Sequence, residues 1–487
     1  MLFNSLPFIL VFAPLVISIY WCLAGRENAR LWFLVLASIA FYGYWNIAHV
    51  PLLVLSLGAN WLAAGVFARA DRDLTELADR VNPPYDQCVM SGLRSRRIAR
   101  RSRTRKTVIA VSAIGGNLSV LAFYKYLAFF AATLNQTIGS DFHVTPAELP
   151  LGISFFTFHH IIYWVDLQRG QAPFYRLRDY ALYIVNFPQI LAGPLVRNRE
   201  IVPQFRLDPW RDGWDERLGR GITLFSIGLA KKAFLADSLA TTATEIFAKA
   251  GRAPLTCLEA WNGCLSFAFQ IYFDFSGYSD MAIGLALMLG MVLPLNFDIP
   301  YRAVNLREFW RRWHITLSFF LRDYVYIPLG GSRSGPTRQM FALAATMALG
   351  GLWHGAGWTF VLWGLLHGVG LAVCALWQRC LPPLPRPLGW ALTLVFVFVG
   401  WVLFRAGTLE AAGGMLAGMS GAGGLGQFGA WRTLVIAAAV ALLGPSSVQA
   451  SATMAPRATW AAVSALVIVT ALFKIGGGGY EFIYFQF

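Results

Sequence analysis

Long apolar runs recur along the whole chain of 487 residues, and few charged residues interrupt them. Only 13% of the residues are charged, whereas soluble domains have roughly 25%. The pattern predicts an all-α polytopic membrane protein with roughly 10–13 membrane-embedded segments, because interrupted helices cannot be counted from apolar length alone. The runs lie near 5–24, 31–48, 50–68, 108–132, 149–165, 221–247, 259–293, 340–353, 357–377, 388–404, 431–444 and 458–473.

The most basic segment indicates which way the chain crosses the bilayer. Residues 94–106 carry eight cations and no acid. Cytoplasmic loops of membrane proteins are enriched in lysine and arginine, so we expect the loop 69–107 in the cytoplasm and the N-terminus outside. Contact with anionic lipids accounts for this charge and for the net charge of +15, and we expect no nucleic-acid partner. Binding of another polyanion remains an alternative.

No polar segment is long enough to form a separate soluble domain. We therefore expect one integral membrane domain over 1–487, with N-terminal spans in 1–68, the basic loop in 69–107, a core in 108–380 and C-terminal spans in 388–487. Residues 180–195 are short for a span and contain two prolines, which favours a re-entrant hairpin. The Gly- and Ala-rich residues 411–430 are expected to form a flexible loop.

Two histidines stand in unusual surroundings. Between Leu306 and Tyr324 apolar residues recur at three- and four-residue steps, which predicts one amphipathic helix in the membrane interface with His314 on its apolar side. His354 follows an almost charge-free run and is flanked by glycines at 350, 351, 355 and 357. An ionisable side chain in such a segment needs a partner or a function.

The chemistry that the residues permit is centred on these histidines, since Walker A, H-E-x-x-H and G-x-S-x-G motifs are absent. A neutral imidazole can take a proton from a hydroxyl that attacks a carbonyl, and a second imidazole can orient the first. A structural role for His354 remains open on this evidence. His159 and His160 are adjacent, so they point about 100° apart on a helix and do not share one metal easily. For His367 an interhelical hydrogen bond is a sufficient explanation.

At the level of longer motifs the sequence resembles the membrane-bound O-acyltransferase family, and within it the membrane subunit of alginate O-acetylation and related bacterial polysaccharide O-acetylation proteins. The resemblance spans most of the chain. It rests on the segments around His314 and His354 and on four further ones, which are LPLGISFFTFHHIIYWVD (149–166), NFPQILAGPLVR (186–197), FQIYFDFSGYSDMAIGLALMLG (269–290) and the terminal FIYFQF (482–487). One departure is His159, where relatives more often have glutamine.

This resemblance implies a helical bundle with a central tunnel, with His354 as general base and His314 as its assistant. It implies transfer of an acetyl group from cytoplasmic acetyl-CoA across the membrane to an exported, alginate-like polysaccharide. A periplasmic or membrane-anchored acyltransferase is the expected partner, and the bacterial inner membrane the expected location. Arg311, Arg312 and Arg322 are candidates for the acetyl-CoA phosphates. We expect acetyl-CoA only as a substrate, with no permanently bound cofactor and no metal.

Three alternatives remain at this level. The same fold could transfer D-alanine from a carrier protein, or acetylate peptidoglycan or cellulose. A transporter would need carboxylates inside the membrane, for which Asp274 and Asp280 are the candidates, although hydrogen bonds that break a helix near Gly277 are the preferred explanation. A non-enzymatic scaffold of a polysaccharide export complex is the third alternative.

Overall fold

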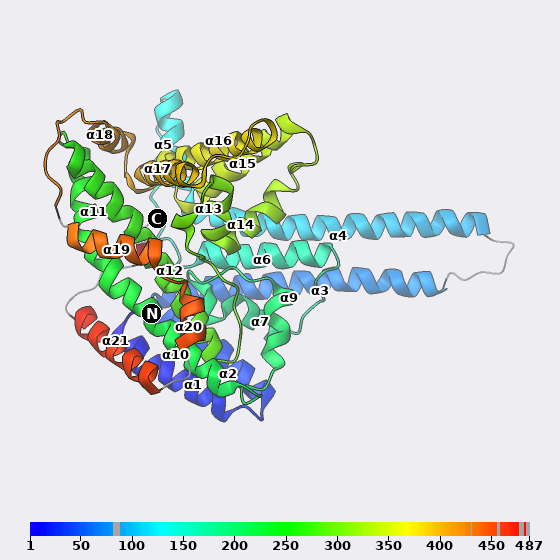
Figure 1. The fold of residues 1–487 in the computed structure, drawn as a ribbon. Coiled ribbons are helices and arrows are strands. Elements are labelled where there is room, and N and C mark those ends of the chain that lie inside the picture. Colours follow the sequence, from blue (N-terminus) through cyan, green and yellow to red (C-terminus); the bar gives the residue numbers. More distant parts are fainter. Residues whose placement is uncertain (81–87, 430, 455–457, 477–481, 484–487) are drawn as a thin grey trace. The chain divides into compact units, whose positions relative to one another are not determined.

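The computed structural model describes residues 1–80, 88–429, 431–454, 458–476 and 482–483; side chains of 71–80, 88–101 and 476 are outside this description. Helix is the only regular structure in these residues, in agreement with the predicted all-α membrane fold (Figure 1). The chain forms two compact units. The smaller unit contains Cys22–Leu191 and Val196–Leu207, and the larger unit contains Met1–Trp21, Ala192–Leu195 and Asp208–Phe487.

The smaller unit is built from helical elements, the two longest of which are α3 and α4. They are α2 (Glu27–Gly43), η2 (Ile47–His49), α3 (Val50–Arg80), α4 (Cys88–Lys125), α5 (Leu127–Ile138), α6 (Ile153–Gln168), α7 (Leu177–Val185), α8 (Phe187–Ile190), α9 (Asn198–Ile201) and η4 (Val202–Arg206).

The described elements of the larger unit are also all helical, and several of its helices are interrupted by π-helical or 3₁₀ turns. They are η1 (Phe8–Phe12), α1 (Ala13–Cys22), α10 (Trp214–Ala230), η5 (Lys231–Ala236), α11 (Asp237–Ala250), α12 (Cys257–Met288), η6 (Pro300–Arg302), α13 (Leu306–Arg312), α14 (Ile315–Leu321), η7 (Arg322–Tyr326), α15 (Pro336–His354), α16 (Trp358–Cys380), α17 (Arg386–Arg405), α18 (Leu409–Met419), α19 (Trp431–Leu443), α20 (Ser447–Met454) and α21 (Ala458–Gly476).

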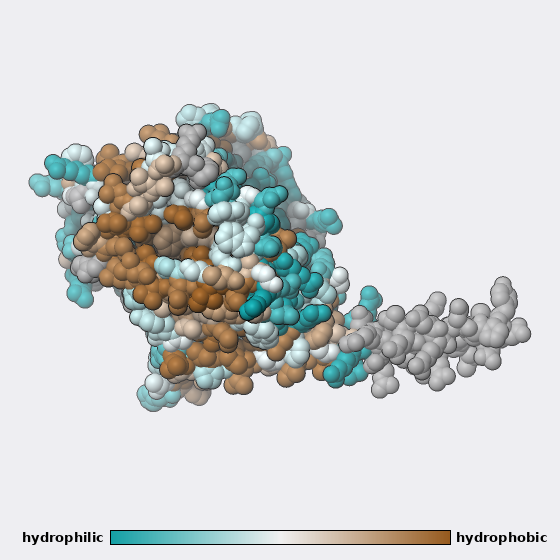
Figure 2. All heavy atoms as spheres, turned by 90° about the horizontal axis from the view of Figure 1, so that it is seen from below, coloured by the Kyte–Doolittle hydropathy of each residue, from teal (hydrophilic) through white to brown (hydrophobic). Residues whose placement is uncertain are grey.

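Five described helices are long and apolar enough to cross a bilayer. A sixth span results if Trp431–Leu443 and Ser447–Thr453, which are bent by 73° relative to one another, are counted as one broken helix. The five are Ile47–Ala70, Ser102–Lys125, Trp358–Cys380, Arg386–Arg405 and Ala458–Ile475. Figure 2 shows broad hydrophobic areas on the face that it presents, as expected for a surface in contact with lipid.

A polar cluster joins three helices of the smaller unit. α3 and α4 run side by side (Figure 1), and the amides of Asn60 and Asn117 bond to each other at 3.1 and 2.8 Å. Trp164 on α6 donates its indole N–H to Asn60 Oδ1 at 2.7 Å. Buried amides are costly unless they are hydrogen-bonded, so this cluster fixes the register of the three helices.

The predicted basic loop is helical over most of its length. α3 continues to Arg80 and α4 begins at Cys88, so the two helices extend beyond the apolar spans that end at Ala70 and begin at Ser102. Residues 81–87 and the side chains of 71–101 lie outside the described structure, and with them most of the basic segment. The cytoplasmic position of this segment stays a prediction.

Two adjacent lysines of the larger unit contact α12, and Lys232 is buried while Lys231 is partly buried. Lys231 Nζ lies 2.7 Å from Asp280, while Lys232 Nζ lies 2.6 Å from Asp274 and 2.8 Å from Asp237. The lysines stand on η5, a π-helical turn, and such turns insert an extra residue into a helix. Buried charges are tolerated when they are paired, and here each lysine has its own carboxylate on α12.

This pairing corrects the interpretation of Asp274 and Asp280 from sequence. We expected their hydrogen bonds to break the helix near Gly277, but α12 is continuous from Cys257 to Met288. The carboxylates instead neutralise the two lysines of η5.

The structure corrects two further expectations about secondary structure. The amphipathic segment Leu306–Tyr324 is not one helix but α13, α14 and the π-helical turn η7, with an extended residue at Trp313. The expected loop 411–430 is helical as far as Met419, because α18 spans Leu409–Met419. A side chain at Gly414 would collide with the carbonyl of Ala250, so the small residues of this segment serve helix packing as well as flexibility.

Candidate active site

His354 is the last residue of α15, where this helix meets α16. The two helices run antiparallel (Figure 1) and come so close that a side chain at Gly351 would collide with the Phe360 carbonyl. The same holds for Gly364 and the Met347 carbonyl. Small residues allow this approach between membrane helices. His354 therefore stands at the closed end of a tightly packed hairpin.

Aromatic rings surround His354. The ring centroids of Trp353, Trp363 and Phe404 lie 4.8, 5.3 and 5.1 Å from that of the imidazole. The side chain is 5% exposed. Hydrogen bonds and charges act more strongly where water is excluded, so this site suits a reaction in which charge develops on a substrate atom.

His314 lies at the break between α13 and α14, with a backbone φ of 42°. This left-handed conformation is uncommon outside glycine, and such residues are often found at functional sites. Asn296 stabilises the break. Its Oδ1 accepts hydrogen bonds from His314 Nδ1 and Thr316 Oγ1, both at 3.0 Å, and its carbonyl oxygen accepts one from the Ile315 N–H at 2.9 Å.

The bond to Asn296 also determines the tautomer of His314. An amide oxygen only accepts, so Nδ1 carries the hydrogen and Nε2 the lone pair. Burial lowers the pKa of His314 to about 3, and the ring is therefore neutral at physiological pH. A neutral imidazole with its lone pair on Nε2 is able to accept a proton or a hydrogen bond.

The structure brings the two predicted histidines to the same side chain. The ring centroid of Trp353 lies 6.3 Å from that of His314 and 4.8 Å from that of His354. The roles assigned to the two histidines stay predictions. Asn296, which orients one of them, was missed from sequence because no motif marks it.

The three candidate arginines differ in what they contact. Arg312 pairs with Glu308 at 2.8 Å, and Arg322 with Asp323 at 2.7 Å. Arg311 is exposed and has no ion pair in the part of the chain that the structure describes. Of the three, Arg311 is best suited to bind an external phosphate, and that role stays a prediction.

The remaining buried histidines serve contacts within each unit. In the smaller unit His160 Nδ1 lies 2.7 Å from the Tyr180 hydroxyl, and His159 Nδ1 lies 2.9 Å from the Phe155 carbonyl oxygen. In the larger unit Trp310 on α13 donates to His367 Nδ1 on α16 at 3.3 Å. The interhelical hydrogen bond expected for His367 is thus confirmed.

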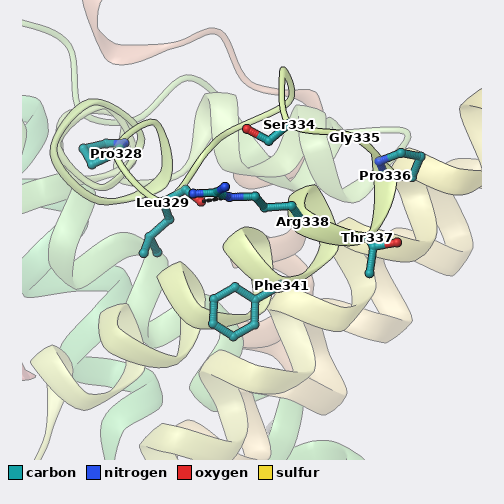
Figure 3. Close-up of a pocket in the computed structure, with 8 residues that line it drawn as sticks. All are labelled: Pro328, Leu329, Ser334, Gly335, Pro336, Thr337, Arg338 and Phe341. Carbon is teal, nitrogen blue, oxygen red and sulfur yellow. Dashed lines mark hydrogen bonds between the residues drawn. The ribbon is translucent and has the colours of Figure 1, made fainter.

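A surface pocket of about 640 Å³ lies at the opposite end of α15 (Figure 3). In it Arg338 donates from Nε to the Leu329 carbonyl oxygen at 3.1 Å. Arg338 and His354 are 16 positions apart on α15, which is about 24 Å at 1.5 Å per residue, so the pocket does not include His354. It is lined by Pro328, Leu329, Ser334, Gly335, Pro336, Thr337, Arg338 and Phe341.

Within the described residues, no group of three or more histidine, cysteine or acidic side chains is arranged to hold a metal ion. The polar side-chain groups that lie at His314 and His354 are imidazole, indole and amide groups.

Known proteins resemble this chain across the site. The family model described as MBOAT, membrane-bound O-acyltransferase family, matches residues 153–408, which include His314 and His354. The chain is 38% identical over 459 residues to a Helicobacter pylori protein named peptidoglycan O-acetyltransferase, with 87% of this chain and 81% of the relative covered.

Two other relatives carry different names. The chain is 40% identical over 439 residues to an Azotobacter vinelandii protein named probable alginate O-acetylase, with 88% of this chain and 79% of the relative covered. It is 27% identical over 246 residues to a Streptococcus thermophilus protein named teichoic acid D-alanyltransferase, with coverages of 47% and 57%.

Proposed function

Since this chain belongs to the membrane-bound O-acyltransferase family, we propose that it transfers an acetyl group from cytoplasmic acetyl-CoA across the membrane for O-acetylation of an envelope polysaccharide. The chain is a polytopic membrane protein and an acyltransferase. Relatives named for acetyl transfer are matched over more than 85% of this chain, and the one named for D-alanyl transfer over 47%. This difference favours acetyl as the group transferred.

The observation that carries the proposal is that His314 and His354, 40 positions apart in sequence, both contact the Trp353 ring in a buried aromatic site. In the reaction the oxygen of an acceptor hydroxyl attacks the thioester carbonyl carbon while its proton moves to His354. The tetrahedral intermediate then collapses, the C–S bond breaks, and the departing thiolate takes the proton from the imidazolium. His314 orients the groups beside it.

The polymer that receives the acetyl group is either peptidoglycan or an alginate-like exported polysaccharide. The similarity to relatives named for each is nearly equal, at 38% and 40%. We propose a separate periplasmic or membrane-anchored acyltransferase as the protein that completes the transfer, because the described structure is helical throughout and contains no separate domain to hold a polymer. The bacterial inner membrane is the matching location.

Acetyl transfer by the purified protein in proteoliposomes tests the proposal. With radiolabelled acetyl-CoA on the side of the basic segment and polymer plus partner on the other, the wild-type protein should move label to the polymer. His354→Ala should not. If the label stays in acetyl-CoA both with peptidoglycan and with an alginate-like polysaccharide as acceptor, acetyl transfer is contradicted. Transfer from a D-alanyl carrier protein would support the alternative donor.

A further inference from the structure

The surface pocket at the N-terminal end of α15 is built around one arginine. Figure 3 shows Arg338 extending from α15 to Leu329, whose carbonyl oxygen accepts a hydrogen bond from Nε at 3.1 Å. Gly330 lets the segment before α15 close over this side chain, since a Cβ atom there would lie 2.6 Å from Arg338 Nε and its φ is 118°. The guanidinium is therefore held in place beside an open volume of about 640 Å³.

The guanidinium of Arg338 has more hydrogen-bond donors than the fold uses. It carries five N–H groups, and the bond to Leu329 uses the one on Nε. In the part of the chain that the structure describes, the two terminal nitrogens have no acceptor and no ion pair. A planar pair of N–H groups matches the oxygens of a phosphate. The hydroxyl-bearing residues Ser334 and Thr337 line the same pocket.

The charge around this pocket is positive. Residues 324–409 contain five arginines and no aspartate or glutamate. Four of the five lie at the end of α15, α16 and α17 where the pocket opens, and they are Arg333, Arg338, Arg379 and Arg386. The acids that precede this stretch, Glu308 and Asp323, each pair with another arginine. This end of the three helices therefore attracts anions.

The pocket lies at the depth where a membrane span ends. Arg379 donates from Nη2 to Oε1 of Gln339, the residue after Arg338, at 2.6 Å. Arg379 is in the last turn of α16, one of the helices long and apolar enough to cross the bilayer. Because positive charge marks cytoplasmic ends, we expect the pocket at the cytoplasmic surface, where the leaflet carries anionic lipids.

Apolar side chains continue from the pocket along α15. Phe341 lines the pocket and is 64% exposed, and Leu349, about two turns further on the same face, is 51% exposed. Leu329 and two prolines complete the apolar part of the lining. A free phosphate or a nucleotide has no acyl chain to cover this face. A phospholipid has both a phosphate and acyl chains, so it matches both parts of the pocket.

We propose that this pocket binds an anionic phospholipid, with the headgroup phosphate on Arg338 and an acyl chain along Phe341. An anionic headgroup such as phosphatidylglycerol keeps its negative charge among the four arginines. A zwitterionic headgroup such as phosphatidylcholine adds a cation, which these arginines repel. The inference goes beyond the proposed acyl transfer and does not depend on it.

Thermal unfolding of the purified full-length chain in detergent, with added phosphatidylglycerol or phosphatidylcholine, measures this binding. A lipid that binds only the folded state raises its stability in a concentration-dependent way. Phosphatidylglycerol should raise the Tm of the wild-type protein more than phosphatidylcholine does at equal mole fraction. Arg338→Gln should weaken the apparent Kd for phosphatidylglycerol about fivefold, the usual contribution of one arginine near an anionic membrane surface.

Two further variants separate the pocket from its surroundings. Arg386→Gln is the matched control, because it removes one positive charge from the same end of the helices but does not line the pocket. Its apparent Kd for phosphatidylglycerol should stay within about twofold of wild type. Phe341→Ala should weaken binding of long-chain phosphatidylglycerol and leave binding of a short-chain form unchanged, since only the acyl-chain contact is lost.

Three results would overturn the proposal. Arg338→Gln could bind phosphatidylglycerol as tightly as the wild-type protein does. Arg338→Gln and Arg386→Gln could weaken binding equally, which would mean a general attraction of charge instead of a site. Acetyl-CoA, added in place of lipid, could raise the Tm of the wild-type protein but not of Arg338→Gln while both keep the same response to phosphatidylglycerol. The phosphates of the acyl donor would then occupy the pocket.

Discussion

The buried histidines of the two units are held in different ways. In the smaller unit both nitrogens of His160 have a partner, the Tyr180 hydroxyl at 2.7 Å and the Ser56 hydroxyl at 3.2 Å. His159 contacts the Phe155 carbonyl oxygen and, through Nε2, the Val196 N–H at 3.5 Å. His160 thus connects α6 to α3 and α7, whereas His159 bonds within α6 and to Val196.

In the larger unit His314 and His367 are each bonded through Nδ1. Nδ1 of His314 donates to Asn296, and Nδ1 of His367 accepts from Trp310. Within the described residues Nε2 of His367 has no acceptor. Burial alone therefore does not distinguish the two candidate catalytic histidines from the other buried histidines. What differs within the described residues is the bonding of each ring, which for His160 involves both nitrogens and for His367 involves Nδ1 alone.

The largest effect is expected at His354. His354→Ala should lower kcat by roughly 10²–10⁴-fold, because positioned proton transfer contributes about that much. Donor binding, measured as the Kd for acetyl-CoA, should change little. Tm and yield of the purified variant serve as controls. A folded variant with a near wild-type rate would mean that another residue is the general base. His354 would then not differ in function from the buried histidines of the smaller unit.

His314 should have the next largest effect. His314→Ala should lower kcat by on the order of tenfold or more, and His314→Asn should retain part of the rate by keeping a group that can donate to Asn296. The pH dependence of stability is a second measurement. Since the folded pKa of about 3 is below the unfolded value near 6.5, this residue favours unfolding as the pH falls from 6.5 toward 3. The decrease in Tm over that range should be smaller in His314→Asn.

If the Ala and Asn variants both matched wild type in rate, His314 would belong with the structural histidines of the smaller unit.

His160 should show the opposite behaviour, a loss of stability without a loss of chemistry. His160→Phe leaves the buried Tyr180 hydroxyl without its partner, which should cost about 1–3 kcal/mol. The double variant with Tyr180→Phe should recover part of that loss, because both polar groups are then absent. Thermal unfolding in detergent measures the stability, and kcat per folded molecule should stay at the wild-type value. A fall in kcat per folded molecule would contradict the expected difference in role between the buried histidines of the two units.

The smallest effect is expected at Arg311. Arg311→Gln should raise the KM for acetyl-CoA about two- to fivefold, the usual size of an exposed ionic contact. Added salt should reduce the difference by screening. Arg312→Gln provides the comparison, since Arg312 is occupied by Glu308. Equal KM values for wild type and Arg311→Gln at low salt would contradict phosphate binding at Arg311.

Composition and local motifs determine much of this protein. A chain with 13% charged residues and recurrent apolar runs has little choice but to form membrane helices. The almost charge-free run before His354 and the glycines at 350, 351, 355 and 357 identified His354 in the sequence. These features are readable because apolar length and small residues act locally along one helix or between neighbours in sequence.

Tertiary structure decided what depends on partners distant in sequence. The apolar periodicity of Leu306–Tyr324 runs through His314, and the break there exists because Asn296, 18 positions earlier, bonds to His314 and Thr316. No local pattern shows that Lys231 and Lys232 would each meet a carboxylate of α12. The tautomer of His367 on α16 is likewise set by a distant residue, because Trp310 on α13 donates its indole N–H to Nδ1. Hydrogen bonds and close packing between helices are set by three-dimensional proximity, which periodicity along the chain does not encode.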